Sequence, residues 1–442
     1  MKLSHVAEIV SGTLVGDDAQ VSVEASFDSR DVPSGGIFAA VAGERVNGHQ
    51  YVAPALAGGA GVALVSERVD ASPLIVVDDV PVALGKLAAA HVAANRRHLT
   101  VLAVTGSMGK TTTKDLLAGI LPGPTVASEK SLNNELGVPL TCLRCTPETR
   151  YLVLEMGADR VGDLAYLTSL VPPDLGIVLA VGSAHLEKFG TVGAVAKAKS
   201  ELIQGLTPGG TAVLNADDPR VAGMASLADD VVFFGADAEV RAENLRLDSG
   251  DHASFDLVTP FGIAPVELGL VGAHHVANAL AAAAAAMSVG IATEEIAARL
   301  SDQVAASPHR MHVVERADGV TVIDDSYNAN PQSMASGIEA LARIGRGRRT
   351  VAVLGPMLEL GDVSEAEHRA VGELLAARHV EIVHLLGPIA ATIAPAGIET
   401  HIHQDLDGIR AALAEQVRSG DVLLFKSSNG ARLHEVAQEW IS

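Results

Sequence analysis

A glycine-rich segment, TGSMGKTTTK at residues 105–114, constrains the fold more than any other part of this 442-residue chain. The apolar run VLAVT, which is typical of a buried strand, leads directly into it. Glycines let backbone N–H groups approach phosphate oxygens, and a helix that starts at the loop adds the positive end of its dipole. In such loops the lysine, here Lys110, neutralises the outer phosphates, and the next hydroxyl, here Thr111, binds magnesium. The segment therefore predicts a strand, a phosphate-binding loop and a helix.

The spacing of this loop, GxxGKT, is shorter than the general pattern GxxxxGK[ST]. Taken alone, it indicates nucleotide binding and leaves a kinase, a switch protein and a transporter subunit all open. The residues expected around the phosphates are Thr105, Gly106, Ser107, Met108, Gly109, Lys110, Thr111 and Thr112.

A chain of this length is expected to form two or three domains rather than one core. After the loop, the apolar runs YLVLEM, DLGIVLAV and TAVLN alternate with helical stretches, which is typical of a doubly wound parallel sheet. The runs GVTVIDD, RTVAVLG, VEIVHLLG and DVLLFKSS repeat this alternation near the C-terminus. We therefore predict an α/β protein of three domains: a small α/β domain (1–98), a central, mostly parallel sheet of the phosphate-loop type flanked by helices (99–310), and a Rossmann-like α/β domain (311–442).

Two segments of the predicted central domain depart from that alternation. Residues 229–270 contain several short strand-like pieces. The alanine-rich segment NALAAAAAAMSVG is predicted to be a helix that ends at Gly290, because alanine is the best helix former and packs closely against its neighbours. A second alanine-rich helix is expected near residues 82–96, at the end of the first domain.

The charge balance of 32 basic against 53 acidic residues gives a net charge of −21, which argues against nucleic acid as a partner. The N-terminal sequence MKLSHVAEIVSGTLVGDD has polar residues too early for the apolar core of a signal peptide. No later stretch approaches the roughly 18 apolar residues of a membrane span. We therefore expect a soluble, cytoplasmic protein.

The two cysteines, Cys142 and Cys145, have the CxxC spacing of some redox and zinc sites. They lie in VPLTCLRC, an apolar stretch with helical periodicity, and no second pair completes a zinc site. We favour a structural role for both.

A magnesium–nucleotide site also needs ligands at the ends of neighbouring strands. Glu155 ends the apolar run YLVLEM, which places a carboxylate where open α/β sheets bind ligands. His185 follows the run DLGIVLAV in the sequence AHLE. An ordinary surface glutamate and a structural histidine are the alternatives that the pattern leaves open.

Eight segments follow one another in the order and spacing of a known family. They are TGSMGKTTTK, SLNNELGVPLT, EMGADRVGDL, AHLEKFGTVGAVAKAK, NADDP, SPHRM, DDSYNANPQSM and LELGDVSEAEH. This order resembles that of the Mur ligases of bacterial peptidoglycan synthesis, over essentially the whole chain. DDSYNANP and EMGA look like the member that adds D-alanyl-D-alanine, and the DNPR sequence associated with the diaminopimelate-adding member is absent. The segment FDSRDVPSGGIFAAVAGERVNGHQYVAPAL is similar to that member's uridine-nucleotide-binding domain.

The resemblance implies an ATP-dependent ligase that forms an amide bond. The carboxylate of a UDP-N-acetylmuramoyl tripeptide would attack the γ-phosphate of ATP, giving an acyl phosphate and ADP. The amine of D-alanyl-D-alanine would then attack the acyl carbon and release phosphate. Positioning and charge neutralisation bring the anionic nucleophile to the triphosphate. The first domain would bind the UDP substrate, and the third would close over ATP and bind the dipeptide.

The same resemblance implies two magnesium ions. Thr111 and Glu155 would hold one on the β and γ phosphates, and His185 would hold the other near the acyl phosphate. Lys199, in AVAKAKSEL, falls where the family carries an N-carbamylated lysine, a change that converts a cation into a metal ligand. A solvated helix lysine is the alternative, and we expect Lys197 to be one. The catalytic residues implied are Lys110, His185, Lys199 and Arg310.

Further contacts follow from the resemblance. Asn278 would lie beside adenine, although it could instead satisfy free backbone N–H groups at a helix start. Arg310 would reach the γ-phosphate and Asp325 the ribose, with Asn328 in the same loop. Turn formation is an equally good explanation of Asn328 and Asn330. The implied contacts with the UDP substrate are those of Ser29, Arg30 and Asn134.

Four positions depart from the family pattern. Met108 replaces a small or polar loop residue, which matters little because the loop binds through its backbone. His275 stands where asparagine is usual, Pro356 where aspartate is expected, and Asn429 where arginine is usual. An arginine at position 429 could contact substrate, so the last change bears on dipeptide selectivity and efficiency.

Two other functions stay open at this level: an amide ligase of the same architecture with different substrates, and a nucleotide-binding regulatory or scaffold protein without catalysis. Intact Lys110, Glu155, His185 and Lys199 argue against the second. The partners expected are small molecules, and the protein is expected to be a monomer. The third residue of the tripeptide, lysine or diaminopimelate, stays open too; Glu44, Arg45 and Asn47 lie where the first domain could face it.

Overall fold

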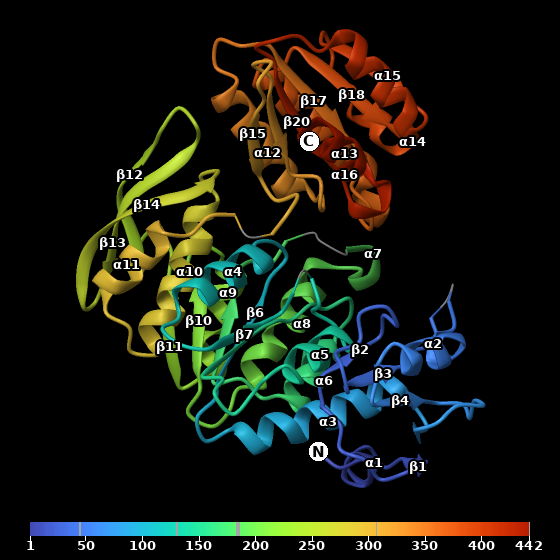
Figure 1. Cartoon of the computed structure of the whole chain (residues 1–442). Coiled ribbons are helices and arrows are strands. Elements are labelled where there is room, and N and C mark those ends of the chain that lie inside the picture. The colour runs from blue at the N-terminus through green and yellow to red at the C-terminus, as the bar shows by residue number, and fades with distance from the viewer. Residues whose placement is uncertain (44–45, 130, 183–185, 306, 442) are drawn as a thin grey trace.

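The structure is a computed structural model of the chain and describes residues 1–43, 46–129, 131–182, 186–305 and 307–441. These residues form four β-sheets, and in three of them nearly all neighbouring strands are parallel. Figure 1 shows an N-terminal region in blue, a central region from teal through green to yellow, and a C-terminal region in orange and red. The α/β class predicted from the sequence is confirmed.

The N-terminal region is built on a five-stranded sheet with the order β1-β5-β4-β3-β2, in which β1 alone is antiparallel to its neighbour. Its elements are α1 (Leu3–Val10), β1 (Thr13–Val15), β2 (Ala25–Ser26), β3 (Ile37–Ala39), the 3₁₀ turn η1 (Gly48–Tyr51), α2 (Val52–Ala57), β4 (Val62–Val65), β5 (Leu74–Val76) and α3 (Val80–Asn95). The Asp79 carboxylate caps α3 by accepting a hydrogen bond from Val82 N at 2.8 Å, which fixes where this helix begins.

The central region contains a wholly parallel six-stranded sheet with the order β11-β10-β9-β6-β8-β7. Its elements are β6 (Thr100–Thr105), α4 (Lys110–Ile120), β7 (Thr125–Ala127), α5 (Gly137–Cys142), β8 (Tyr151–Glu155), α6 (Asp163–Leu170), β9 (Leu175–Val178), α7 (Leu186–Phe189), α8 (Val192–Gln204), β10 (Thr211–Asn215), α9 (Pro219–Ala222), η2 (Gly223–Leu227) and β11 (Asp230–Phe234). Because β6 lies between β8 and β9, the strand order reverses beside it. Open α/β sheets bind ligands at the carboxyl ends of strands at such a point.

Alternate residues of β6 are buried on opposite faces of this sheet. Val101 and Ala103 belong to a core with α3, α5, α6 and α8, and the same core continues into the N-terminal region. Leu102 and Val104 belong to a second core with α4 and α10. The strand is therefore apolar throughout, as expected for a parallel strand covered on both sides.

Residues 229–270, which broke the alternation in the sequence, begin with β11 of the parallel sheet, and the rest forms a separate antiparallel sheet with the order β12-β13-β14. Its elements, with the helices that follow, are β12 (Arg241–Leu247), β13 (His252–Thr259), β14 (Gly262–Val271), α10 (His275–Ser288) and α11 (Thr293–Ser301). Ala279 and the alanines at 281–286 of α10 are completely buried, so this helix packs closely against α4 and the sheet. Gly290 follows the helix with a φ of 87°, which confirms the predicted end.

The C-terminal region contains a six-stranded sheet with the order β15-β16-β20-β17-β18-β19, in which only β15 is antiparallel. Its elements are β15 (His312–Glu315), β16 (Thr321–Asp324), α12 (Pro331–Ile344), β17 (Thr350–Leu354), η3 (Gly361–Val363), α13 (Ser364–Ala377), β18 (Ile382–Leu386), α14 (Gly387–Ala390), η4 (Ala391–Ile393), β19 (Glu399–His403), α15 (Leu406–Gln416), β20 (Val422–Lys426), η5 (Asn429–Ala431) and α16 (Leu433–Ile441). Helices α12 and α13 cover one face, and α15 and α16 cover the other.

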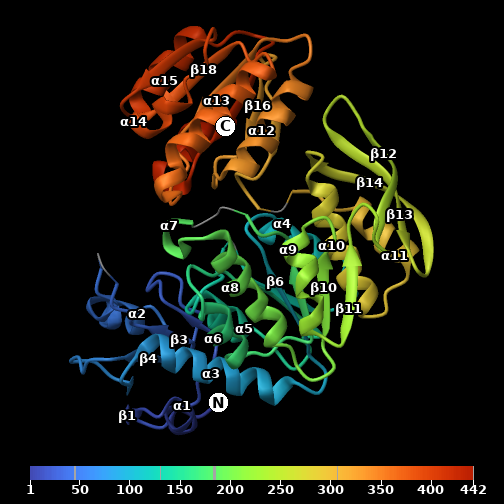
Figure 2. The ribbon, with the colours of Figure 1, turned by 180° about the vertical axis from the view of Figure 1, so that it is seen from behind.

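The C-terminal region is attached to the central one mainly by polar contacts. The Arg343 guanidinium of α12 donates to both carboxylate oxygens of the buried Asp251, at 2.5 and 2.9 Å. Glu187 N donates to Glu359 O at 3.1 Å, and Lys188 Nζ lies 3.5 Å from the Glu359 carboxylate. Figure 2 shows from behind that the C-terminal region lies above the carboxyl ends of the central strands.

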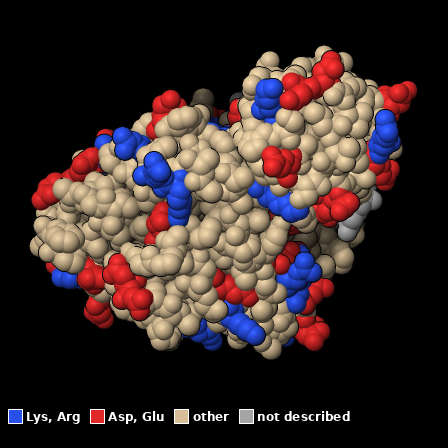
Figure 3. All heavy atoms as spheres, turned by 90° about the horizontal axis from the view of Figure 1, so that it is seen from below, with Lys and Arg blue, Asp and Glu red and all other residues tan. Residues whose placement is uncertain are grey.

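Acidic and basic side chains are interspersed on the face of the molecule that Figure 3 shows. The net charge of −21 is therefore not gathered into one patch on that face. Within the described residues, no helix combines the length and apolar character needed to cross a membrane.

Candidate functional site

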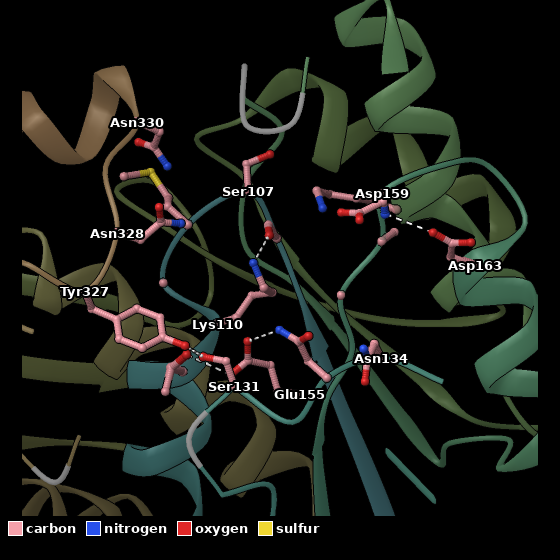
Figure 4. A pocket seen from close by; sticks show the side chains of 18 of the residues that line it. Ser107, Lys110, Ser131, Asn134, Glu155, Asp159, Asp163, Tyr327, Asn328 and Asn330 are labelled. Carbon is pink, nitrogen blue, oxygen red and sulfur yellow. Dashed lines mark hydrogen bonds between the residues drawn. The ribbon is translucent and has the colours of Figure 1, made fainter. Parts of the chain in front are cut away.

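A cavity of about 1090 Å³ lies between the carboxyl ends of the central strands and the C-terminal region. One side of the cavity is lined by the first turn of α3 and by the loop between β6 and α4. The segment before α5, the segment after β8, and residues of α8 and α10 also line this side. The other walls are the linker before β15, the loop between β16 and α12, and the end of β20. Figure 4 shows the side chains that converge there.

The phosphate-loop segment forms the predicted strand, loop and helix. Gly109 has a φ of 79° and directly precedes α4, whose first residue is Lys110. The Lys110 ammonium donates to Gly106 O at 2.9 Å, within its own loop. Burial lowers the pKa of Lys110, opposed by the charge of Glu155, and the charge of Arg310 lowers it further. The N-terminus of α4 and two neighbouring cations therefore face the cavity together.

The loop is also braced from the next strand. Ser107 N donates to Ala180 O at 2.9 Å, and Ser107 Oγ accepts from Gly182 N at 2.8 Å. Both partners follow β9. Thr105 and Thr111 are buried, and Gly106, Ser107, Met108 and Thr112 line the cavity.

Glu155 is 1% exposed at the end of β8, so the interpretation as a surface glutamate is wrong. Its Oε2 accepts from Thr111 Oγ1 at 2.7 Å, and its Oε1 accepts from Asn133 Nδ2 at 2.8 Å. A carboxylate and a hydroxyl at the phosphate end of a cavity are the hard oxygen donors that Mg²⁺ prefers. The residues present therefore fit a magnesium ion.

Lys199 is 4% exposed in α8 and lines the cavity, so it is not a solvated helix lysine. Burial and, to a smaller extent, the charge of Lys110 together lower its pKa to about 7, against the opposing charge of Asp159. A large fraction of this amine is therefore neutral near neutral pH. Lys197 is exposed, as expected.

Asn278 lies directly over the phosphate loop. A Cβ built on Gly109 would approach the Asn278 Oδ1 to 2.4 Å. The same oxygen accepts from Thr113 Oγ1 at 3.4 Å, and Asn278 Nδ2 lies 3.1 Å from His275 Nδ1. These are side-chain partners, so the interpretation as a cap for free helix N–H groups is not supported.

Arg310 reaches the cavity from the linker before β15. Its guanidinium carbon lies 4.3 Å from the centroid of the Tyr327 ring, and its Nη2 lies 3.5 Å from Ser131 Oγ. Asp325 lies beside it, and its Oδ2 accepts from the buried Lys426 ammonium at 2.5 Å. Lys426 also donates to Asn328 O at 3.0 Å, so one lysine contacts two residues of the loop between β16 and α12.

The two loop asparagines have local roles. Asn328 Oδ1 accepts from Ala329 N at 2.8 Å. Asn330 caps α12, because its Oδ1 accepts from Ser333 N while Ser333 Oγ accepts from Asn330 N. Asn330 is thus a helix cap rather than a turn residue, and both asparagines also line the cavity.

The predicted substrate residues fall in two places. Asn134 lines the cavity, and its Oδ1 accepts from Gly137 N at 2.9 Å at the start of α5. Ser29 and Arg30 lie outside the cavity lining, in the N-terminal region, where the Arg30 guanidinium pairs with Asp28 at 2.6 Å. His185, Glu44 and Arg45 lie outside the described residues.

The departures from the family pattern are distributed around the same cavity. Met108, His275 and Asn429 line it. Burial keeps the pKa of His275 well below its usual value, so its ring is neutral and can support Asn278. Pro356 is not among the lining residues, and its carbonyl accepts from Ser428 N at 3.0 Å.

Both cysteines are buried free thiols, which supports the structural role. Cys142 lies in α5 and Cys145 just beyond it. Burial raises the pKa of both thiols, that of Cys145 to about 12, so neither is poised as a thiolate at neutral pH.

Asn133, Tyr327 and Lys426 are among the cavity residues that were missed from the sequence. Asn133 and Tyr327 lie inside the quoted motifs SLNNELGVPLT and DDSYNANPQSM, so motif membership was a usable signal. Lys426 ends a strand, and its position in the sheet order beside β16 identifies it only once the fold is known.

Comparisons with known proteins agree with this geometry. Residues 104–286 match a family model described as the Mur ligase middle domain, and residues 309–429 match one described as the Mur ligase glutamate ligase domain. The ligase from Mycobacterium tuberculosis named UDP-N-acetylmuramoyl-tripeptide--D-alanyl-D-alanine ligase is 40% identical, with 100% of this chain and 98% of that protein covered. The protein of the same name from Escherichia coli is 37% identical, with 99% and 97% covered.

Solved structures show the same similarity. The crystal structure of MurF from Acinetobacter baumannii has a TM-score of 0.89 and 32% identity, covering 99% of this chain and 98% of that one. MurF ligase from Thermotoga maritima in complex with ADP has a TM-score of 0.83 and 31% identity, covering 94% and 96%. The three-domain architecture expected from the sequence is thus that of solved MurF structures. The chain belongs to the Mur ligase family.

Proposed function

We propose that the protein joins D-alanyl-D-alanine to the tripeptide carboxylate of UDP-N-acetylmuramoyl tripeptide, with ATP converted to ADP and phosphate. The observation that carries the chemistry is the convergence of Lys110, Glu155, Lys199 and Arg310 on one cavity. The full-length similarity to ligases named for this reaction supports the choice of substrates.

ATP would bind with its phosphates against the loop before α4. Lys110 and Arg310 would neutralise charge on the outer phosphates, and Asn278 would contact the adenine side. Asp325, held by Lys426, would face the ribose. The relative solved with ADP supports nucleotide binding in this fold.

The tripeptide carboxylate would enter beside Lys199 and attack the γ-phosphate, which gives an acyl phosphate. Attack by the dipeptide amine would form the amide and release phosphate. Thr111 and Glu155 are proposed to hold one magnesium ion, which supplies charge neutralisation at the β and γ phosphates. His185 and Lys199 are proposed as ligands of a second ion.

Carbamylation of Lys199 is a part of this proposal. A neutral lysine amine can take up carbon dioxide and become a carboxylate. Support comes from the burial of Lys199 and from its lowered pKa of about 7, which leaves a reactive neutral amine at neutral pH. The carbamate would also relieve the repulsion between this side chain and Lys110.

The substrates proposed are small molecules. Because one of them is a nucleotide-linked precursor, we also propose that the enzyme acts in the cytoplasm, as a monomer. Sedimentation at micromolar concentration is expected to give the mass of one chain.

The test is to incubate the pure protein with ATP, magnesium, UDP-N-acetylmuramoyl tripeptide and D-alanyl-D-alanine, and to weigh the product by mass spectrometry. We expect a product heavier by one dehydrated dipeptide, with ADP release that requires both substrates. Tripeptides with lysine and with diaminopimelate are run in parallel. Activity only with other amines would instead favour a different amide ligase, and no product or ADP would favour a protein without catalysis.

Lys199→Ala tests the carbamate. We expect ligation to fall by at least about 100-fold, because losing even a residue that only orients a metal ligand costs about 10-fold to 100-fold. Short carboxylic acids such as acetate should restore part of the activity. Lys197→Ala is the matched control on the exposed face of the same helix. An undiminished Lys199→Ala enzyme would refute the idea.

A further inference from the structure

Arg310 lies between two residues with left-handed backbone. His309 has a φ of 59° and Met311 a φ of 51°, which are uncommon values for residues other than glycine. Contacts with the end of β16 hold both of them. His309 Nδ1 lies 2.6 Å from the buried Asp324 carboxylate, and Met311 N donates to Asp325 Oδ1 at 3.2 Å. The C-terminal region therefore fixes the backbone from which Arg310 projects.

The side chain of Arg310 is held by a second element of the same region. Its guanidinium carbon lies 4.3 Å from the centroid of the Tyr327 ring, a distance at which a cation is attracted to the ring face. Tyr327 N donates to His309 O at 3.1 Å, so the backbone of Tyr327 is bonded to the linker that carries Arg310. Ring and guanidinium are thus both held by contacts with the C-terminal region.

The Tyr327 hydroxyl reaches across to the central region. It donates to Ser131 Oγ at 2.7 Å, and Arg310 Nη2 lies 3.5 Å from the same oxygen. A serine oxygen has two lone pairs and can accept from both. Figure 4 shows the Tyr327 hydroxyl pointing toward Ser131, with Glu155 next to Ser131.

Ser131 is itself close to the proposed metal site. Two residues further along the chain, Asn133 donates to Glu155 Oε1 at 2.8 Å. The bridge from Tyr327 therefore ends on the segment that orients the Glu155 carboxylate. The hydrogen bond between Tyr327 and Ser131 therefore connects the ring that holds Arg310 with the phosphate end of the cavity.

We infer that Tyr327 is a positioning residue: its hydroxyl bonds to Ser131 when the C-terminal region docks, and its ring then fixes Arg310 against the γ-phosphate. This inference rests on the proposed function, because it assigns Arg310 to the phosphate that is transferred. Docking of the C-terminal region therefore also places Arg310 at the γ-phosphate. ATP that binds while this region is undocked is not activated.

The experiment compares Tyr327→Phe, Ser131→Ala and the double variant. Each is measured for the dissociation constants of MgADP and of a magnesium complex of a non-hydrolysable ATP analogue, and for kcat. Phenylalanine keeps the ring and removes only the hydroxyl. We expect each single variant to bind the analogue about three-fold to ten-fold more weakly, as for the loss of one hydrogen bond, with a similar fall in kcat and unchanged binding of MgADP. The double variant should resemble either single one.

Two further variants sharpen the result. Tyr327→Leu removes the ring as well and should bind the analogue more weakly than Tyr327→Phe. Tyr151→Phe is the control, because Tyr151 begins β8 at the opposite end of the strand from Glu155 and does not line the cavity. It should behave like the wild-type protein.

Three results would overturn the inference: wild-type binding of the analogue by Tyr327→Phe, multiplying losses in the double variant, or an equal loss for MgADP and the analogue. Equal losses would mean general destabilisation of the site. Because the binding measurements need neither tripeptide nor dipeptide, they remain decisive even if the wild-type protein forms no amide. Failure of the proposed function would therefore be seen separately, as wild-type protein that binds the analogue and makes no product.

Discussion

At the scale of single residues, the cavity places two lysines near each other with little access to water. Lys199 is buried and Lys110 is half-buried, and the charge of Lys110 lowers the pKa of Lys199. An anionic ligand between them relieves this repulsion, and so does a change of Lys199 from amine to carbamate. Holding two neighbouring cations in the cavity lowers the stability of the folded protein, and the binding site requires both of them.

Lys199→Met should reveal that cost as a function of pH. The pKa of Lys199 is about 7 in the folded protein and 10.5 when unperturbed, so between these values only the unfolded chain holds the proton. The penalty is therefore full below pH 7 and shrinks as pH rises toward 10.5. We expect the free energy of unfolding gained by Lys199→Met to fall by roughly 1–3 kcal/mol between pH 7 and pH 9.

Urea unfolding in metal-free and carbonate-free buffer measures this difference. Lys197→Met, at the exposed position on the same helix, should show no comparable trend. A gain from Lys199→Met that stays constant across this range would contradict a lowered pKa.

Some of the site could be predicted residue by residue, and some could not. Lys110 and Thr111 follow from a local pattern in which loop, helix start and side chains are adjacent in sequence. The contact of Tyr327 with Ser131 spans 196 residues, and that of Lys426 with Asp325 spans 101. Such pairs depend on sheet order and on how two regions dock, and a single sequence does not encode either in a local pattern.

At the scale of elements, the phosphate loop depends on a close approach between the start of α4 and α10. Gly109 has a φ of 79°, and a Cβ there would meet Asn278 Oδ1 at 2.4 Å. The loop can therefore lie against α10 only with glycine at this position.

Gly109→Ala is expected to destabilise the protein by about 1–3 kcal/mol, because the backbone is strained and Asn278 must move. Affinity for MgATP should fall as well, since the loop and Asn278 shift together. Gly193→Ala is the matched control in α8, where the nearest atom to a new Cβ lies 3.8 Å away and alanine favours the helix. Thermal unfolding and nucleotide titration measure both effects, and wild-type values for Gly109→Ala would refute the argument.

The elements themselves were predictable to different degrees. Strands buried on both faces, such as β6, β8 and β17, are short apolar runs and were identified. The edge strands β15 and β19 were not, because their sequences HVVE and ETHIH carry polar residues and are only partly buried. A strand at the edge of a sheet needs less apolar surface, so its sequence says less about it.

At the scale of the whole molecule, the C-terminal region is held by a few polar contacts. The strongest of them by geometry is the pair of hydrogen bonds between Arg343 and the completely buried Asp251. Removing one partner of such a pair leaves an uncompensated charge. A single substitution in this pair is therefore expected to weaken the docking of the C-terminal region onto the central region.

Asp251→Asn is expected to release the C-terminal region in the absence of ligand. We expect the radius of gyration measured by X-ray scattering to increase, and to return toward the wild-type value when the ATP analogue and tripeptide are added. Glu439→Gln, which removes an exposed partner of Arg410 within the C-terminal region, is the control and should leave the profile unchanged. Profiles of the variant that match the wild type in every condition would count against a role in docking.

The apolar core that joins the N-terminal and central regions through α3 has a consequence for unfolding. Two sheets that share one continuous core cannot lose it separately, so they form a single cooperative unit. The C-terminal sheet has its own cores, which hold only Val271 from outside that region, and forms a second unit. By its sheets the chain has three domains, but in a calorimeter it should melt as two.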